Sequence, residues 1–159
     1  NGLVLLGLIE GVSALVLRCG GAEGCVSPAE LGGLLDGVFL DLVPVVLEIA
    51  DGGSTYVAAA DALLDMLTGL DDDQRSRLSV DLGADPLPAP LSGRPATDLC
   101  DVVAAAEKGA EYGGHVRAIT VDGGHVRRQA DLNVLFLLSA AVDIEVARFF
   151  HQVPAVNLV

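Results

Sequence analysis

Blocks of consecutive apolar residues alternate along this chain with segments in which apolar residues recur at helical spacing. The central block lies within Asp36 to Ala50 and runs from Val43 to Ile49 without alternation, a pattern typical of a strand buried on both faces of a parallel sheet. Similar blocks at 13–18, 78–82 and 116–121 predict three further strands. The strand centres are roughly 30 to 40 residues apart, which leaves room for a helix between successive parallel strands.

The segments between the strands predict helices. Ser27-Pro28-Ala29-Glu30 is a capping box with proline at the first helical position. The helix after it is predicted to bury the apolar side chains at helical spacing, Leu31, Leu34, Leu35 and Val38. Residues 1–10 are predicted to end a helix or to cover the sheet. Further helices are predicted over 55–70, capped by Ser54, over 97–112, capped by Thr97 with Leu99, Val102, Val103 and Ala106 facing inward, and over 130–150.

Two polar or proline-rich segments predict loops. Asp71-Asp72-Asp73 follows the second long helix, and negative charge is unfavourable at a helix C-terminus, so a solvated loop is predicted there rather than a metal site. Four prolines between 86 and 95 predict an extended connector.

The alternation of strands and helices predicts an α/β fold with a parallel sheet, and two architectures fit it. One is a partial (β/α)₈ barrel, since a complete barrel needs about 250 residues. The other is a small doubly wound sheet. We expect residues 1–159 to form a single domain, a fragment of a larger barrel; the chain begins without methionine, so we also expect residues before Asn1.

Composition narrows the classes of partner. The formal charge is −13 and Lys108 is the only lysine, a balance that disfavours nucleic acid and anionic membrane surfaces. The longest apolar run, at 134–142, is too short to cross a bilayer, and Glu10 interrupts the apolar amino end in a way that a signal peptide does not. Three cysteines without ligand-like spacing indicate reduced thiols in a cytoplasmic protein rather than zinc ligands: Cys19, Cys25 and Cys100.

Glycine pairs follow three of the four predicted strands, and ligands bind at strand ends in both architectures. The best-placed phosphate-binding candidate is Gly52-Gly53-Ser54, at a helix start, with Thr120 at the end of the fourth strand. No nucleotide-binding motif accompanies these glycines, so tight turns between strand and helix are the favoured explanation for them. Asp122 and His125 share the last exit loop and are candidates for acid–base chemistry, although the pattern alone assigns no catalytic residue. Glu48 either pairs in a barrel interior or faces outward.

Four phrases in order resemble the small, or beta, subunit of methylmalonyl-CoA mutase: EGVSALVLR (10–18), LLDGVFLDLVPVVLE (34–48), LGADPL (82–87) and HVRAITVDG (115–123). The resemblance implies an adenosylcobalamin-dependent isomerase that interconverts methylmalonyl-CoA and succinyl-CoA. It also implies a (β/α)₈ barrel and a heterodimer in which the large subunit holds the acyl-CoA substrate and the cofactor. The small subunit of such a pair is expected to be structural.

The resemblance has limits that bear on the site. The DxHxxG pattern of the cobalamin-binding domain is absent, so no cofactor is expected to bind this chain alone. Gly124 stands where a tyrosine precedes the substrate-contacting histidine of the large subunit, which weakens a catalytic role for His125. The rival hypothesis is a self-contained barrel-type domain that binds an acyl-CoA or phosphate ligand at its strand exits.

Overall fold

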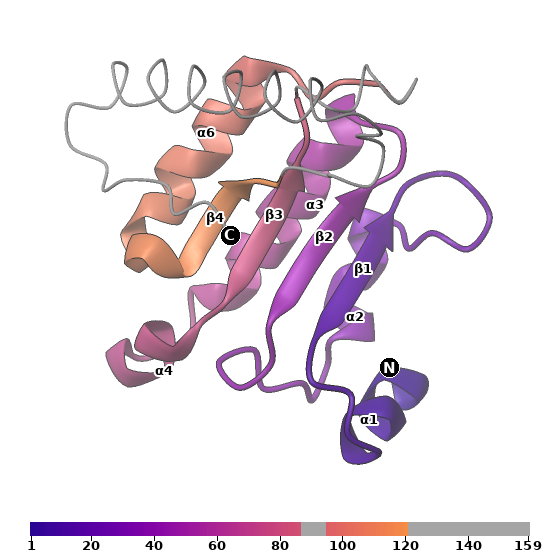
Figure 1. Ribbon diagram of the computed structural model, residues 1–159, viewed down its shortest axis with the longest axis vertical. Helices are drawn as coiled ribbons and strands as arrows, with labels where there is room; N and C mark the ends of the chain where they lie inside the picture. Colours follow the sequence, from indigo (N-terminus) through magenta and orange to yellow (C-terminus); the bar gives the residue numbers. More distant parts are fainter. Residues whose placement is uncertain (87–94, 121–159) are drawn as a thin grey trace, which may run out of the picture.

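The computed structural model describes residues 1–86 and 95–120, in which four parallel strands form one sheet (Figure 1). The strands are β1 (Leu15–Cys19), β2 (Val45–Ile49), β3 (Val80–Ala84) and β4 (Val116–Ile119), and they lie side by side in chain order. Leu15 pairs with Val45, Val45 with Val80, and Val80 with Val116, so these four residues form one row across the sheet. The register between β3 and β4 shifts between Asp81 and Ala84. The predicted α/β class and the parallel sheet are confirmed.

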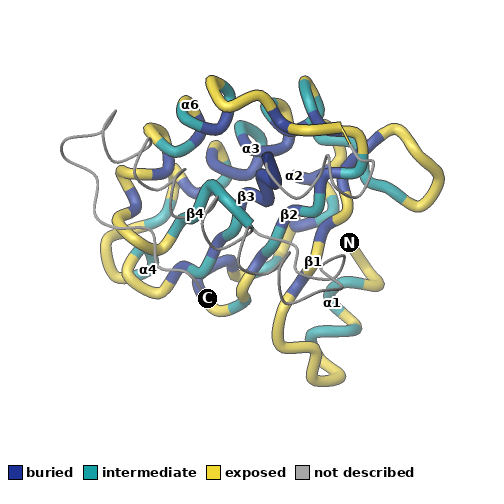
Figure 2. The backbone as a smooth tube through the Cα atoms, turned by 45° about the horizontal axis from the view of Figure 1, so that its top comes forward, coloured by how far each residue is buried: buried dark blue, intermediate teal, exposed yellow. Residues whose placement is uncertain are grey.

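Helices cover one face of this sheet in the part of the chain that is described. α2 (Leu31–Leu34), α3 (Gly53–Leu67) and α6 (Leu99–Gly109) lie on that side, with α3 in contact with both other helices (Figures 1 and 2). Burial therefore alternates along β1: Leu15, Leu17 and Cys19 are buried, whereas Val16 and Arg18 are exposed. The core contains these strand residues together with Tyr56, Ala59, Ala60, Leu63, Leu64 and Leu67 of α3.

The prediction that Val43 to Ile49 is buried on both faces is wrong for the described residues. Val45, Leu47 and Ile49 are buried, whereas Val46 and Glu48, on the face away from the helices, are half-buried. The strand also begins later than predicted. Pro44 has no N–H to donate to a ladder, although its carbonyl accepts the Leu15 amide at 2.9 Å.

The capping box at Ser27 is confirmed. The Glu30 carboxylate accepts the Ser27 hydroxyl at 2.7 Å and the Ser27 amide at 3.1 Å. The helix that it opens is shorter than predicted, with the 3₁₀ turn η1 (Pro28–Glu30) followed by the single turn of α2. Gly32 and Gly33 lower its helix propensity. Leu31 and Leu35 are buried, while Leu34 and Val38 pack partly against the core.

The aspartate triplet begins a helix, so the solvated loop predicted there is wrong. Asp71 is the N-cap of α4 (Asp72–Arg77), and its carboxylate accepts the Gln74 amide at 2.8 Å while the Gln74 side chain accepts the Asp71 amide at 3.1 Å. Asp72 and Asp73 occupy the first turn, where negative charge is favourable. The same charges that end one helix poorly start the next one well.

The boundaries of the third long helix also differ from the prediction. Asp98, not Thr97, caps α6, with its carboxylate accepting the Cys100 amide at 2.7 Å. Val102 is buried as predicted, but Leu99 is half-exposed because it lies in the first turn beyond the edge of the core. A 3₁₀ turn, η2 (Ala110–His115), leads into β4. The connector at 87–94 and the helix predicted over 130–150 lie outside the described residues.

The amino end of the chain forms α1 (Gly2–Ile9), as predicted for a helical segment there. Among residues 1–86 and 95–120, no helix combines the length and the apolar character that crossing a membrane requires.

Candidate functional site

The carboxyl ends of the four strands meet along one edge of the sheet, because the strands are parallel. The predicted ligand-binding residues lie along this edge, with Gly52, Gly53 and Ser54 after β2 and Thr120 after β4. The strand β3 lies between these two strands. Asp122 and His125 follow Thr120 but lie outside the described residues.

Asp51 connects the ends of the first two strands. Its carboxylate accepts the Gly21 amide at 2.9 Å and a hydrogen bond from the Thr55 side chain. These two donors, Gly21 first, hold the pKa of the Asp51 carboxyl below its usual range. Asp51 was not among the predicted site residues. An aspartate directly before a glycine pair at a helix start is nevertheless a pattern typical of a carboxylate that accepts backbone amides.

Gly52 is buried beneath the chain segment that precedes α6. A Cβ at this residue would lie 3.0 Å from the Pro95 carbonyl oxygen and 3.4 Å from that of Ala96. Its φ of +63° also favours glycine. Close backbone packing thus explains this glycine without a ligand.

Ser54 does not cap α3, contrary to the prediction. The N-cap is Gly52, which makes no side-chain hydrogen bond, and Ser54 lies exposed in the first turn. Ser54 is therefore a predicted site residue that is exposed to solvent at this edge. A ligand at Gly52, Gly53 and Ser54 stays a prediction.

Thr120 is held by a carboxylate of the neighbouring strand. The Thr120 hydroxyl donates a short hydrogen bond to Asp81 of β3, and the Thr120 amide donates to the Ala84 carbonyl at 2.8 Å. The same Asp81 oxygen accepts the Gly83 amide at 3.2 Å. The Asp81 side chain is only 14% exposed. These bonds fix the end of β4 against β3.

The sheet face opposite the helices carries two ion pairs between registered residues. Arg18 and Glu48 are partners across β1 and β2, with Arg18 Nε 3.4 Å from a Glu48 oxygen. Asp81 and Arg117 are partners across β3 and β4, with a separation of 3.6 Å. Of the two alternatives for Glu48, the structure shows a paired carboxylate on the face away from the helices.

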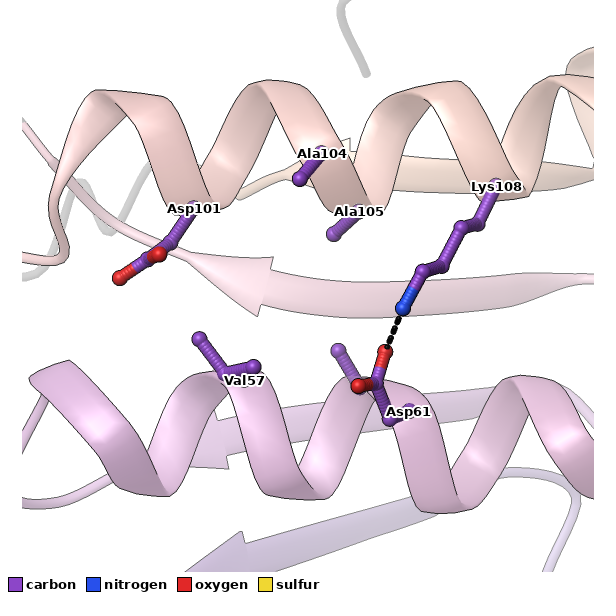
Figure 3. A pocket seen from close by; sticks show the side chains of 7 residues that line it. Val57, Asp61, Asp101, Ala104, Ala105 and Lys108 are labelled. Atoms are coloured by element: carbon purple, nitrogen blue, oxygen red, sulfur yellow. Dashed lines mark hydrogen bonds and ion pairs between the residues drawn. The ribbon is translucent and has the colours of Figure 1, made fainter.

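The helix layer contains a small pocket between α3 and α6, and Figure 3 shows its lining. Lys108 reaches across from α6 to Asp61 of α3 at 2.6 Å, and this carboxylate raises the pKa of the Lys108 ammonium (Figure 3). The pocket holds about 40 Å³, enough for a single water molecule. It is therefore a packing feature of two helices that approach closely at alanines.

Neither the cysteines nor the acidic side chains form a metal site in the described residues, where no group of three potential ligands occurs. All three cysteines are free. Burial raises the pKa of the Cys19 thiol to about 11, with smaller contributions from Cys25 and Asp51. Cys19 is accordingly a protonated core thiol.

Comparison with known proteins bears directly on the resemblance noted in the sequence. No family model matches the chain. The chain is 50% identical over 123 residues to the probable methylmalonyl-CoA mutase small subunit of Mycobacterium bovis. The resemblance to this subunit is confirmed. The protein of the same name from Mycobacterium tuberculosis gives the same values, and the methylmalonyl-CoA mutase small subunit of Streptomyces virginiae is 39% identical over 125 residues.

These matches cover 77% of the chain but 19% of each relative. The chain thus spans a minor part of the curated relatives that it matches.

Proposed function

We propose that this chain is part of the small subunit of an adenosylcobalamin-dependent methylmalonyl-CoA mutase, the isomerase that interconverts methylmalonyl-CoA and succinyl-CoA. The observation that carries the proposal is the 50% identity to mycobacterial proteins named as that subunit. In this proposal the chain pairs with a large subunit that holds the acyl-CoA and the cofactor.

The topology supports a barrel segment over a doubly wound sheet. The described strands follow one another in chain order, and the helices α2, α3 and α6 lie on one face of the sheet. A doubly wound sheet reverses its strand order and places helices on both faces, whereas a (β/α)₈ barrel does neither. We infer that β1 to β4 form half of such a barrel, with the two ion pairs on the side of its interior.

The internal hydrogen bonds at the strand exits support a structural role. Asp51 takes the free amide after β1, and Asp81 takes the hydroxyl of Thr120. A substrate at these positions would first have to displace intramolecular partners. Adenosylcobalamin supplies radical chemistry to the complete enzyme, and the described residues do not fit it: His115, their one histidine, lies at the start of β4, at the opposite edge of the sheet.

The proposal is tested by light scattering of the purified chain, alone and mixed with a methylmalonyl-CoA mutase large subunit. A complex of one chain with one large subunit is the expected result. A chain that stays a monomer beside the large subunit contradicts the pairing.

A ligand titration separates this proposal from a self-contained domain. We expect no measurable binding of methylmalonyl-CoA to the chain alone by calorimetry. Binding that disappears in His125→Ala and persists in the control His115→Ala would instead assign a ligand site to the strand exits, with Asp122 and His125 as its chemical groups.

A further inference from the structure

Large apolar side chains are exposed at the amino ends of the strands. Six of the eight large apolar residues that are exposed in the described part of the chain lie in two segments, one preceding β1 and one preceding β2. We call this group the amino-edge surface: Leu3, Leu6, Ile9, Val12, Phe39 and Leu42. Leu3 is 86% exposed, Ile9 83% and Phe39 69%.

The helix α1 is apolar all round. No charged side chain occurs from Asn1 to Ile9, and none of its residues is buried. A helix without a polar face is stable in water only when another surface covers it. Within the described residues, no such surface covers the exposed side of α1.

The two segments form one continuous surface. The Asn1 side-chain amide donates to the Asp36 carbonyl at 3.5 Å, and the Leu5 side chain lies 3.8 Å from the position that a Cβ would take at Gly37. Beside them opens a pocket of about 370 Å³ whose lining includes Phe39, Leu40, Met66, Leu70 and Gln74. An apolar helix and an apolar pocket thus lie next to each other.

The rim of this surface is acidic. Glu10 ends α1, Asp36 lines the pocket, and Asp72 and Asp73 are exposed at the start of α4, next to Gln74. Two arginines of α4 lie near this rim: Arg75 donates to the Leu70 carbonyl at 2.9 Å, and Arg77 is engaged by Asp41 at 2.7 Å and by Asp73. The face that covers this surface should therefore be apolar at its centre and basic at its rim.

The exposed area suits a protein partner. The six side chains are each about half exposed or more. Together they present on the order of several hundred Å², which is more than scattered apolar residues present and close to the roughly 800 Å² that one side of a standard interface buries. We propose that the amino-edge surface is where this chain docks onto the mutase large subunit, through an apolar face of that subunit rimmed by lysine and arginine. The inference rests on the proposed function and names the surface that it uses.

Two triple variants of equal charge test the proposal. The first, Leu3→Asp, Ile9→Asp and Phe39→Asp, places carboxylates within the amino-edge surface. The control, Ala58→Asp, Leu99→Asp and Ala104→Asp, adds the same charge at exposed positions of α3 and α6. Far-UV circular dichroism checks that both fold. The single variant Ile9→Asp is measured as well, because it changes only one side chain and that side chain is largely exposed.

Affinity for the large subunit is measured by surface plasmon resonance at two salt concentrations. We expect the first triple to bind at least about 100-fold more weakly than the unmodified chain and the control to bind within about threefold, since buried charges abolish apolar contacts. Reversing the rim with Glu10→Lys and Asp36→Lys should slow association, most at low salt.

The outcomes separate this inference from the proposed function. If both triples bind like the unmodified chain, the pairing stands and the amino-edge surface is not the interface. If the unmodified chain does not bind the large subunit, the proposed function fails and this inference fails with it. If the chain forms dimers by light scattering that only the first triple dissociates, a second copy covers the surface and the inference is wrong.

Discussion

Replacing Gly83 with alanine should destabilise the sheet at its centre. Gly83 lies in β3 with a φ of +72°, where the register between β3 and β4 shifts. A methyl group there would overlap the Leu47 carbonyl of β2, 2.7 Å from its carbon atom. The left-handed conformation alone costs roughly 1–2 kcal/mol for a residue with a Cβ. Moving β2 away from β3 to relieve the overlap disturbs two buried strands, and we expect a total loss of about 4 kcal/mol, a value reached only by disruptive core changes.

Two glycine controls isolate the overlap from the backbone conformation. Gly53 has a φ of +52° but no atom within 4 Å of its Cβ position, so Gly53→Ala should cost only about 1 kcal/mol. Gly32 is helical and open, and Gly32→Ala should be neutral or stabilising by up to about 1 kcal/mol. Urea unfolding followed by circular dichroism measures all three; with a slope near 2 kcal/mol/M, Gly83→Ala should lower the midpoint by about 2 M. A Gly83→Ala loss within about 1 kcal/mol of the Gly53→Ala loss would refute the overlap argument.

Three further measurements probe other contacts. Tyr56→Phe should leave stability unchanged or raise it by up to about 1 kcal/mol in thermal unfolding, because the buried Tyr56 hydroxyl has no hydrogen-bond partner among the described residues; a clear loss would reveal one. Arg75→Met should cost about 1–2 kcal/mol and Arg75→Lys should recover less than half of it, because the guanidinium caps the carbonyls that end α3 and stacks 5.3 Å from the Tyr112 ring centre. Iodoacetamide at pH 8 should alkylate Cys100 and leave Cys19 unmodified until urea unfolds the chain, since the Cys19 thiol is buried with a pKa of about 11; rapid labelling of Cys19 in the folded chain would show that it is accessible.

Features that depend on a few adjacent residues could be predicted from the sequence. The capping box at Ser27 formed as predicted because its two hydrogen bonds join residues three positions apart. The order of strands and helices was likewise readable, because apolar blocks and helical periodicity are local patterns. The aspartate triplet is also a local feature, but it lies between the end of α3 and the start of α4. Its negative charge is unfavourable at the end of α3 and favourable at the start of α4, and the prediction considered only the first of these two helices.

Features that depend on the far side of a contact could not be predicted in the same way. Nothing near Gly83 in the chain identifies it as the point where β3 meets the Leu47 carbonyl, and nothing near Asp51 indicates that its carboxylate binds Gly21, thirty positions away. Likewise, Val46 and Val45 are the same residue type, and only the placement of the helices makes one half-buried and the other buried.

The α/β class, the chain order of the elements and the likeness to a mutase small subunit could all be recognised in the amino-acid sequence, because they depend on short-range patterns or on residue identity. Which face of the sheet is covered, which carboxylates lie at the strand exits and where apolar surface stays exposed became visible only in the folded chain. Those properties depend on distances between residues far apart in the chain, which packing sets and local sequence does not.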